Sequence, residues 1–546
     1  MIQFISTRLR SSLRSSPIRK PSFRLFYFGS VGAALGYTMQ ATISSWLMAT
    51  LTPSALMVAL VQTASTAPTL LFGLIAGALS DIVERRKVIL VTQLMMLTTV
   101  AILGAAALAG VVGPVSLLLL TFFVGCGFTF YMPAQQASIN EFVSRQELPT
   151  AVALGAVAFN VARAVGPALA GAIAAWLSAG SALLASALSF TLMIAAVRRW
   201  KQREHHLPGV PERLFAGVRS GLRYAWHSTA MRALIIRNLS FSVCASAFWA
   251  LLPVIARDLL GLGAGGFGLL SAAFGTGAIV GAWSIPHQLK RTPLNSIVTY
   301  GALAWTVAVG LIAATNITAL AMVGACGAGA AWVCVLASLS AGTQSSAPAW
   351  VRARAVSMNL VASQASLAVG SALWGLLASW AGIRVALAAS AVAMLLLYVI
   401  VRRFHVQMGG EADVTSGMRL FDLTVAVEPL PGDGPVLIQL EYRIDAQHRK
   451  AFLRAIQAVG PTRRRSGATS WRVFRDLEDE ERFVERYVVA SWADYLRQRA
   501  RMTLADNELQ NQAMQFQRTG TPIRISRLIG ADSEDAFLDA SATASI

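Results

Sequence analysis

The residue best suited to chemistry in this chain is an arginine in the middle of a long apolar run. Arg163 lies near the centre of the run 150–175, three residues after Asn160 and four before Pro167. Proline cannot donate a backbone hydrogen bond, so it frees the carbonyl of residue 163 and predicts a bent helix. A guanidinium in apolar surroundings needs a partner or a polar cavity. Two interpretations stay open: Arg163 and Asn160 contact a substrate or coupling ion, or Arg163 is structural and binds carbonyls at a helix end.

A second cluster follows the apolar run 55–79. It reads Gly77-Ala78-Leu79-Ser80-Asp81-Ile82-Val83-Glu84-Arg85-Arg86-Lys87. A carboxylate at a helix end can pair with nearby arginines, and a glycine lets two helices approach closely. Gly77, Asp81, Arg85 and Arg86 could therefore latch one of two conformations. The alternative is a charged cluster that only ends the apolar segment.

Titratable groups are scarce in the first 410 residues, which contain 28 Lys and Arg but only 7 Asp and Glu. No acid lies at the centre of an apolar run, so Glu141 and Asp258 remain as candidates for a proton-coupling carboxylate. The four cysteines lack metal-site spacing, and no phosphate-binding G-x-x-x-x-G-K-[ST] loop occurs. We therefore expect no catalytic residue, no metal and no cofactor.

Composition and apolar runs indicate a membrane protein. Of the 546 residues, 55% are hydrophobic and only 13% charged, whereas soluble domains are about one quarter charged. The net charge of +19 comes from short basic clusters between apolar runs, so we expect no nucleic-acid partner. About 20 apolar residues cross a bilayer as a helix. Twelve runs qualify: 25–50, 55–79, 87–110, 114–138, 150–175, 180–199, 232–256, 266–286, 294–315, 318–341, 356–380 and 382–401.

The basic clusters predict an orientation for these helices. They alternate along the chain between one side, which holds nearly all of them, and another side that carries only Arg257 and Arg384. Positive loops face the cytoplasm, which predicts that both termini are cytoplasmic. The halves also share a repeat, because Ala164–Gly171 recurs as Ala368–Gly375 with six of eight residues identical. Such internal repeats are typical of secondary transporters built from two related halves.

A polar region follows residue 403. Val436–Ile444 alternates as a strand, and Asp445 can cap a helix that Gly460-Pro461 would end. Further strands are expected at 470–476, 483–491 and 523–528, with helix over 492–516. The order β-α-β-β-α-β predicts a ferredoxin-like α+β domain. We interpret Arg463-Arg464-Arg465 as a solvated or lipid-facing patch.

These motifs carry a family resemblance. The loop Gly77–Lys87 resembles the major facilitator signature G-x-L-a-D-r-x-G-r-R, although Glu84 replaces its glycine. Gly166, Pro167 and Gly171 resemble the Gly-Pro signature of that superfamily's exporters, with Ala170 in place of one glycine. The stretches 133–138 and 147–151 are similar to the bacterial branch of enterobactin exporters and transmembrane secretion effectors. The resemblance implies an all-α membrane protein of twelve helices in two six-helix halves, in the bacterial inner (plasma) membrane.

The same resemblance implies efflux of a small molecule, such as a drug, siderophore or secondary metabolite, by a proton-coupled antiporter. The stretches 483–487 and 491–498 resemble antibiotic-biosynthesis-monooxygenase-like domains, which implies a homodimer through the C-terminal domain. The alternatives are a membrane-tethered monooxygenase-like enzyme and a scaffold without transport activity. The expected segments are a basic tail 1–24, half 25–199, cytoplasmic linker 200–231, half 232–403, linker 404–417, ferredoxin-like domain 418–530 and flexible tail 531–546.

Overall fold

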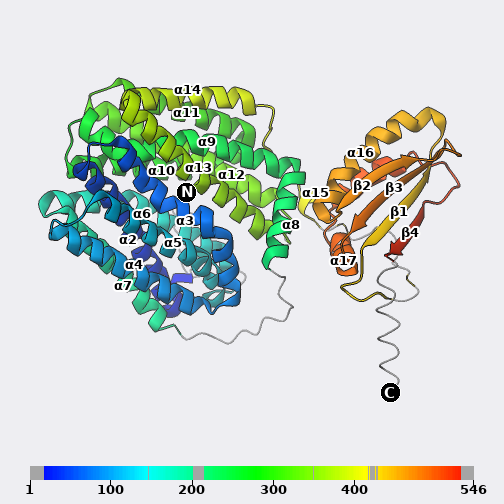
Figure 1. Cartoon of the computed structure of the whole chain (residues 1–546), viewed down its shortest axis with the longest axis horizontal. Coiled ribbons are helices and arrows are strands. Elements are labelled where there is room, and N and C mark those ends of the chain that lie inside the picture. The colour runs from blue at the N-terminus through cyan, green and yellow to red at the C-terminus, as the bar shows by residue number, and fades with distance from the viewer. Residues whose placement is uncertain are drawn as a thin grey trace, which may run out of the picture. The chain divides into compact units, whose positions relative to one another are not determined.

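The first half of the chain forms six long helices in the computed structural model (Figure 1). The structure describes residues 17–144, 147–200, 214–348, 350–415, 417, 425 and 428–530. After a short 3-10 turn at Pro17–Arg19, the helices are α2 (Pro21–Leu51), α3 (Ala55–Ile82), α4 (Arg85–Leu108), α5 (Pro114–Phe142), α6 (Leu148–Trp176) and α7 (Ala179–Arg198). Prolines begin α2 and α5, where a missing N–H costs nothing, and the Ser54 and Ser178 side chains cap α3 and α7.

The second half repeats this arrangement after an additional helix. The helices are α8 (Leu214–His227), α9 (Thr229–Val254), a π-helical turn at Ile255–Leu259, α10 (Ala264–Arg291), α11 (Leu294–Ala314), α12 (Thr318–Ser346), α13 (Arg352–Ala381) and α14 (Ile383–Val401). Helix α8 lies in the segment that we predicted only as a polar linker. Each of the twelve predicted apolar runs lies on one of the other long helices.

Eleven of the described helices are long and apolar enough to cross a membrane. Helix α2 is not among them, but its 31 residues would extend over about 46 Å. Large apolar side chains are exposed on several spans, including Leu188 (68%) and Val307 (72%). Water-soluble surfaces rarely present such contiguous apolar area, whereas lipid tails accept it.

The chain divides into two compact units. Unit 1 comprises residues 1–211, 236–339 and 359–404, and therefore holds most of the spanning helices. Unit 2 comprises residues 212–235, 340–358 and 405–546. Unit 2 thus combines the C-terminal region with α8 and with the adjoining ends of α9, α12 and α13. The segment limits expected from the sequence stay predictions.

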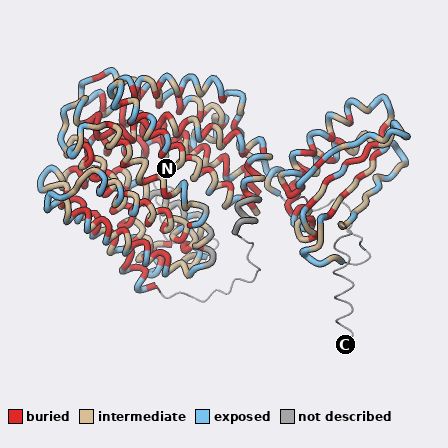
Figure 2. Tube along the Cα trace, viewed as in Figure 1, coloured by how far each residue is buried: buried red, intermediate tan, exposed pale blue. Residues whose placement is uncertain are grey.

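The C-terminal region is a small α+β fold with one antiparallel sheet of four strands. Its strands are β1 (Val436–Arg443), β2 (Ser470–Arg475), β3 (Arg482–Val489) and β4 (Arg524–Ile529), arranged in the order β2-β3-β1-β4. Helices α16 (Arg449–Ser466), α17 (Trp492–Ala500) and α18 (Leu504–Met514) complete it, together with the short α15 (Glu411–Val414) and a 3-10 turn at Ala446–His448. Alternate residues of β1 are buried, as the sequence pattern predicts, and Figure 2 shows buried positions along the strands.

The helix predicted after Asp445 has different ends. Pro461 lies inside α16, which continues to Ser466 and ends at Gly467, whose φ of +151° suits glycine. A proline removes one hydrogen bond, and here tertiary packing outweighs that loss, because Gly460 lies against the Trp471 ring. Asp445 makes no side-chain cap and instead pairs with Arg518 at 3.5 Å. The predicted helix over 492–516 is divided into α17 and α18.

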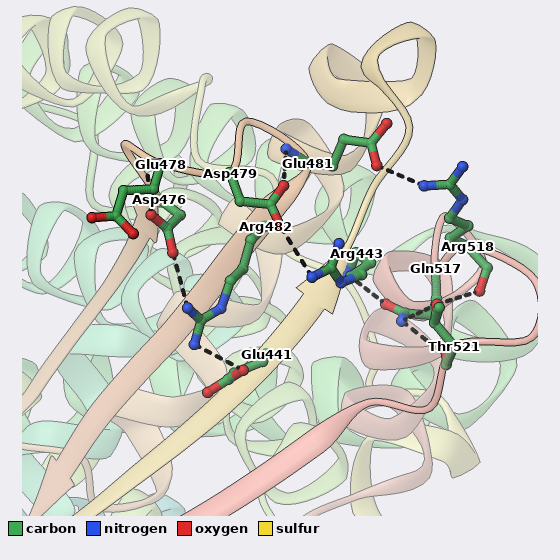
Figure 3. Close-up of polar contacts among 10 residues, drawn as sticks. All are labelled: Glu441, Arg443, Asp476, Glu478, Asp479, Glu481, Arg482, Gln517, Arg518 and Thr521. Atoms are coloured by element: carbon green, nitrogen blue, oxygen red, sulfur yellow. Dashed lines mark hydrogen bonds and ion pairs between the residues drawn. The ribbon is translucent and has the colours of Figure 1, made fainter.

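Ion pairs connect the turn between β2 and β3 to strand β1 and to the loop before β4 (Figure 3). Arg482 bridges Glu441 at 3.0 Å and Asp476 at 2.9 Å. Two further ion pairs have nitrogen–oxygen distances of 3.0 Å (Arg443–Asp479) and 2.6 Å (Arg518–Glu481). Because these groups are partly exposed and screened by solvent, each pair adds little to the stability of the fold.

Candidate functional site

Arg163 lies on α6 beside two aromatic rings. Its guanidinium carbon is 5.3 Å from the Phe159 ring centroid and 5.8 Å from that of Trp249. Trp249 belongs to α9, so both halves of the chain contribute to this contact. Among the described residues, no hydrogen bond or ion pair to Arg163 occurs. The carbonyl bonds expected from a purely structural arginine are therefore not among its contacts.

Further aromatic side chains extend this surface on both sides. Tyr37 of α2 stacks on Phe128 of α5 at 3.8 Å and 11°, and Phe128 lies 6.4 Å from Phe159. On the other side, Trp249 meets Phe274 of α10 at 4.5 Å and Trp332 of α12 at 5.8 Å. We call Arg163, Tyr37, Phe128, Phe159 and Trp249 the Arg163 cluster. Aromatic rings in these geometries present apolar faces to a ligand while Arg163 supplies the charge.

The two copies of the repeat occupy equivalent positions. Gly166 lies against Thr38 of α2, and Gly370 lies against Val243 of α9, so each first glycine meets the first helix of its own half. Gly171 lies against α10 of the other half, where an added Cβ would be 2.8 Å from the Gly268 Cα. Gly375 likewise lies against Ala59 on α3 of the other half.

This close packing continues along α6 toward Pro167. A Cβ on Gly268 would be 2.8 Å from the Pro167 carbonyl oxygen, and one on Gly275 would overlap Ala164. Thr38 Oγ1 also donates a hydrogen bond to the Ala162 carbonyl oxygen at 3.0 Å. Small residues therefore bring α6 of one half and α10 of the other into close backbone contact.

The structure describes the contacts of three of the four residues of the predicted latch. Arg85 donates to the Glu141 carboxylate at 3.1 Å and to the Ala137 carbonyl at 3.2 Å. Arg86 donates to the Val197 and Arg198 carbonyls at the end of α7, at 3.1 and 3.2 Å. The Asp81 side chain lies outside the described residues. The expected close packing at Gly77 is absent, because no described atom lies within 4 Å of an added Cβ.

Both carboxylates proposed for proton coupling have cationic partners. Glu141 pairs with Arg85, which joins it to the predicted latch rather than to the Arg163 cluster. Asp258 pairs with the adjacent Arg257 at 2.5 Å, and Arg257 also donates to the carbonyls of Ala49 and Thr52 at the end of α2. Asn160, the remaining candidate, lies half-buried one helical turn before Arg163.

We expect Asp81→Asn to lower transport sharply, by about ten-fold or more, without preventing membrane insertion. In the latch hypothesis the Asp81 charge helps the Gly77–Arg86 cluster to hold one conformation, whereas a spanning helix keeps its backbone bonds without that charge. The measurement is transport per unit of membrane-inserted protein. The neighbouring Glu84→Gln serves as control, because its partner Lys87 is largely exposed. Normal transport by Asp81→Asn would contradict the latch.

The predicted arginine patch of the C-terminal region is instead partly a buried network. Arg463 is only 6% exposed and donates to the fully buried Glu485 at 3.0 Å. Trp471 Nε1 and the Tyr442 hydroxyl also donate to Glu485, at 2.9 and 3.0 Å. Burial alone would lower the pKa of Arg463, but the Glu485 carboxylate raises that pKa above its ordinary value.

The hydrogen bonds within this network favour a structural role for it. Every named donor points to an acceptor within the network, and Arg465 is likewise bound to Asp506 at 2.6 Å. The described residues contain no group of three His, Cys, Asp or Glu side chains able to hold a metal ion. Sequence reasoning missed the network because three adjacent arginines read as a surface strip. The isolated Glu485 within the otherwise alternating strand β3 was the available signal.

Comparison with known proteins identifies transporters. The family model for transmembrane secretion effectors matches residues 12–535. The multidrug efflux pump Tap of Mycolicibacterium fortuitum is 29% identical over 223 residues, which are 39% of this chain and 54% of that protein. Tap of Mycobacterium tuberculosis is 28% identical over 233 residues, 41% and 55% of the two chains. The chain thus spans about half the length of the curated relatives it matches.

Solved structures show the same fold. A bacterial homolog of the human lysosomal transporter Spinster has a TM-score of 0.59 and 14% identity, covering 72% of this chain and 98% of that one. The nucleoside transporter NupG also gives a TM-score of 0.59, at 12% identity, covering 70% and 99%. At these identities the likeness concerns the fold alone.

Proposed function

The chain belongs to the transmembrane secretion effector family, and from this premise we propose that it exports small organic molecules across the plasma membrane by alternating access. The family and the matching relatives are transporters rather than enzymes. The relatives named as multidrug efflux pumps support export as the direction of transport. The substrate would be a drug, siderophore or secondary metabolite, with a proton as the coupling ion and both termini in the cytoplasm.

The observation that carries this proposal is the pair of symmetric glycine contacts between the halves. Gly171 and Gly375 each pack against the second spanning helix of the opposite half, which is α10 for Gly171 and α3 for Gly375. The Arg163 cluster also takes its residues from both halves. A rocking motion at these contacts would open the cluster first to one side of the membrane and then to the other.

A strain lacking this protein provides the direct test. We expect the deletion strain to lose resistance to a toxic compound or to secrete less of a small molecule, and the full-length chain to restore the phenotype. In energised everted vesicles the same compound should accumulate, and a protonophore should abolish the accumulation. If the compounds found in the screen are transported equally well without the protein, export is refuted.

We propose that the C-terminal region regulates the transporter or directs its assembly. Homodimerisation through this region is one way in which it would do so. Within unit 2, Arg501 lies 4.3 Å from the Trp350 ring centroid, and Arg465 lies 5.7 Å from that of Tyr224 on α8. Arg223 of α8 donates to the Gly467 carbonyl at 3.3 Å. The region therefore contacts the segment that joins the two halves, through which it can bias their movement.

A chain cut after Arg403 should still insert into the membrane and retain part of its transport activity. Spanning helices satisfy their own backbone hydrogen bonds, so they do not need the C-terminal region to fold. Transport should be measured at matched membrane abundance, with Arg501→Ala in the full chain as the milder control. A well-inserted truncation without any transport would show that the region is indispensable.

A further inference from the structure

We propose that the Arg163 cluster binds the anionic group of an amphipathic substrate, namely a carboxylate carried on an apolar or aromatic body. This inference rests on the proposed export function and adds the chemical class of the cargo. It follows from one observation on charge, one on hydrogen bonding and one on shape.

The charge of Arg163 has no counter-ion from the helices around it. Helices α2, α6, α9, α10 and α12 contain no Asp or Glu. The carboxylates Glu147, Glu141 and Asp258 pair with other cations at helix ends. An unpaired arginine charge in a membrane interior raises the free energy of the protein. The anionic group of a bound substrate would offset that cost. A cationic substrate would increase it.

A second hydrogen-bond donor near Arg163 also has no acceptor. The indole Nε1 of Trp249 is buried and makes no hydrogen bond in the described structure, while the ring of the same residue contacts the Arg163 guanidinium. A buried donor without a partner is unfavourable, and a ligand that supplies an acceptor would remove that cost. Both the guanidinium and the neighbouring indole N–H can donate to a ligand, and a carboxylate has two oxygens that accept such bonds.

Comparison with Arg237 shows that the fold can satisfy a buried arginine where it needs one. Arg237 of α9 is 4% exposed and donates to the Phe404 carbonyl and to Asn295 Oδ1, both at 3.2 Å. It also lies over the Tyr398 ring at 5.4 Å. Arg163 has the aromatic contacts but no acceptor among the described residues, which leaves its N–H groups available to a ligand. The stacked Tyr37 and Phe128 rings offer the apolar body of that ligand a flat surface.

The test compares three probes that share a pyrene body and differ in the charge of the head group: pyrenebutanoate (anionic), its methyl ester (neutral) and pyrenebutylamine (cationic). Binding to the full-length protein is measured by fluorescence anisotropy in phosphatidylcholine nanodiscs, so that no anionic lipid competes. We expect the carboxylate to bind at least about ten-fold tighter than the ester or the amine. Arg163→Gln should reduce the affinity for the carboxylate to that for the ester, and leave the ester unchanged. Arg384→Gln, at the start of α14 where Arg384 contacts Asn316, should change neither.

Trp249→Phe keeps an aromatic side chain at this position but loses the indole N–H together with the five-membered ring, and should weaken carboxylate binding by about three-fold or more. If Arg163→Gln fails to fold, the Trp249→Phe variant tests the inference in its place. Equal affinities for the three probes, tighter binding of the amine, or unchanged carboxylate binding by both variants would overturn the inference. Export of the ester or amine in preference to the carboxylate would refute the anion site but leave the export function intact. Arg163-dependent carboxylate binding without transport in energised vesicles would support the site and refute export.

Discussion

Valine at Gly277 or Gly329 should prevent the second half of the chain from folding, and little protein should reach the membrane. Gly277 of α10 lies where an added Cβ would overlap the backbone carbonyl of Cys326 on α12. Gly329 of α12 reciprocally meets the carbonyl of Phe274 on α10. The obstacle in both cases is backbone, which cannot rotate away as a side chain can. The two helices would have to separate along their whole contact.

Overpacking of an ordinary core costs about 1–3 kcal/mol, and a forced backbone separation should exceed that range. The measurements are the amount of protein in the membrane fraction and its melting temperature in detergent. Gly310→Val in α11 is the matched control, since nothing lies within 4 Å of a Cβ at that position. Equal abundance and melting temperature of Gly277→Val and Gly310→Val would show that α10 and α12 do not pack as described.

The second large effect is expected from Glu485→Ala, which should unfold the C-terminal region. Its carboxylate accepts hydrogen bonds from Arg463, Trp471 and Tyr442 inside the α+β fold. Removing it leaves the Arg463 charge buried with too few acceptors, and breaking a buried ion pair in this way costs about 3–5 kcal/mol. The total stability of a folded domain is about 5–15 kcal/mol, so a loss of this size can remove most of the stability of a small α+β region.

Hydrogen exchange of strands β1 and β3 in the full-length protein measures this effect. We expect loss of protection in these strands, while the spanning helices stay protected. Glu481→Ala is the control, because its partner Arg518 is about half exposed and the pair should contribute at most about 1 kcal/mol. Protection of β1 and β3 that equals that of the control would mean that the network does not hold the region together.

The sequence by itself determined where the long helices and the strands lie. Every predicted apolar run coincides with a helix, because the length of a membrane span is a local property set by bilayer thickness. The alternation over β1 and the helical face of Phe452, Ile456 and Val459 are equally local, and those three side chains are buried. Helix α8 was missed because its short amphipathic pattern lies within a polar, proline-containing linker.

The contacts that these residues make with distant parts of the chain could be read only from the tertiary structure. Gly171 meets Gly268, and Arg163 meets Trp249, across distances in sequence that no local pattern encodes. The ends of α16 and the burial of Arg463 were wrongly predicted for the same reason. A proline or a charge is tolerated inside a fold when distant residues supply packing or a counter-ion, as Trp471 and Glu485 do here. The apolar runs of the sequence therefore indicate which segments cross the membrane. The packing of distant helices determines which arginine has hydrogen-bond acceptors within the fold and which can bind a ligand instead.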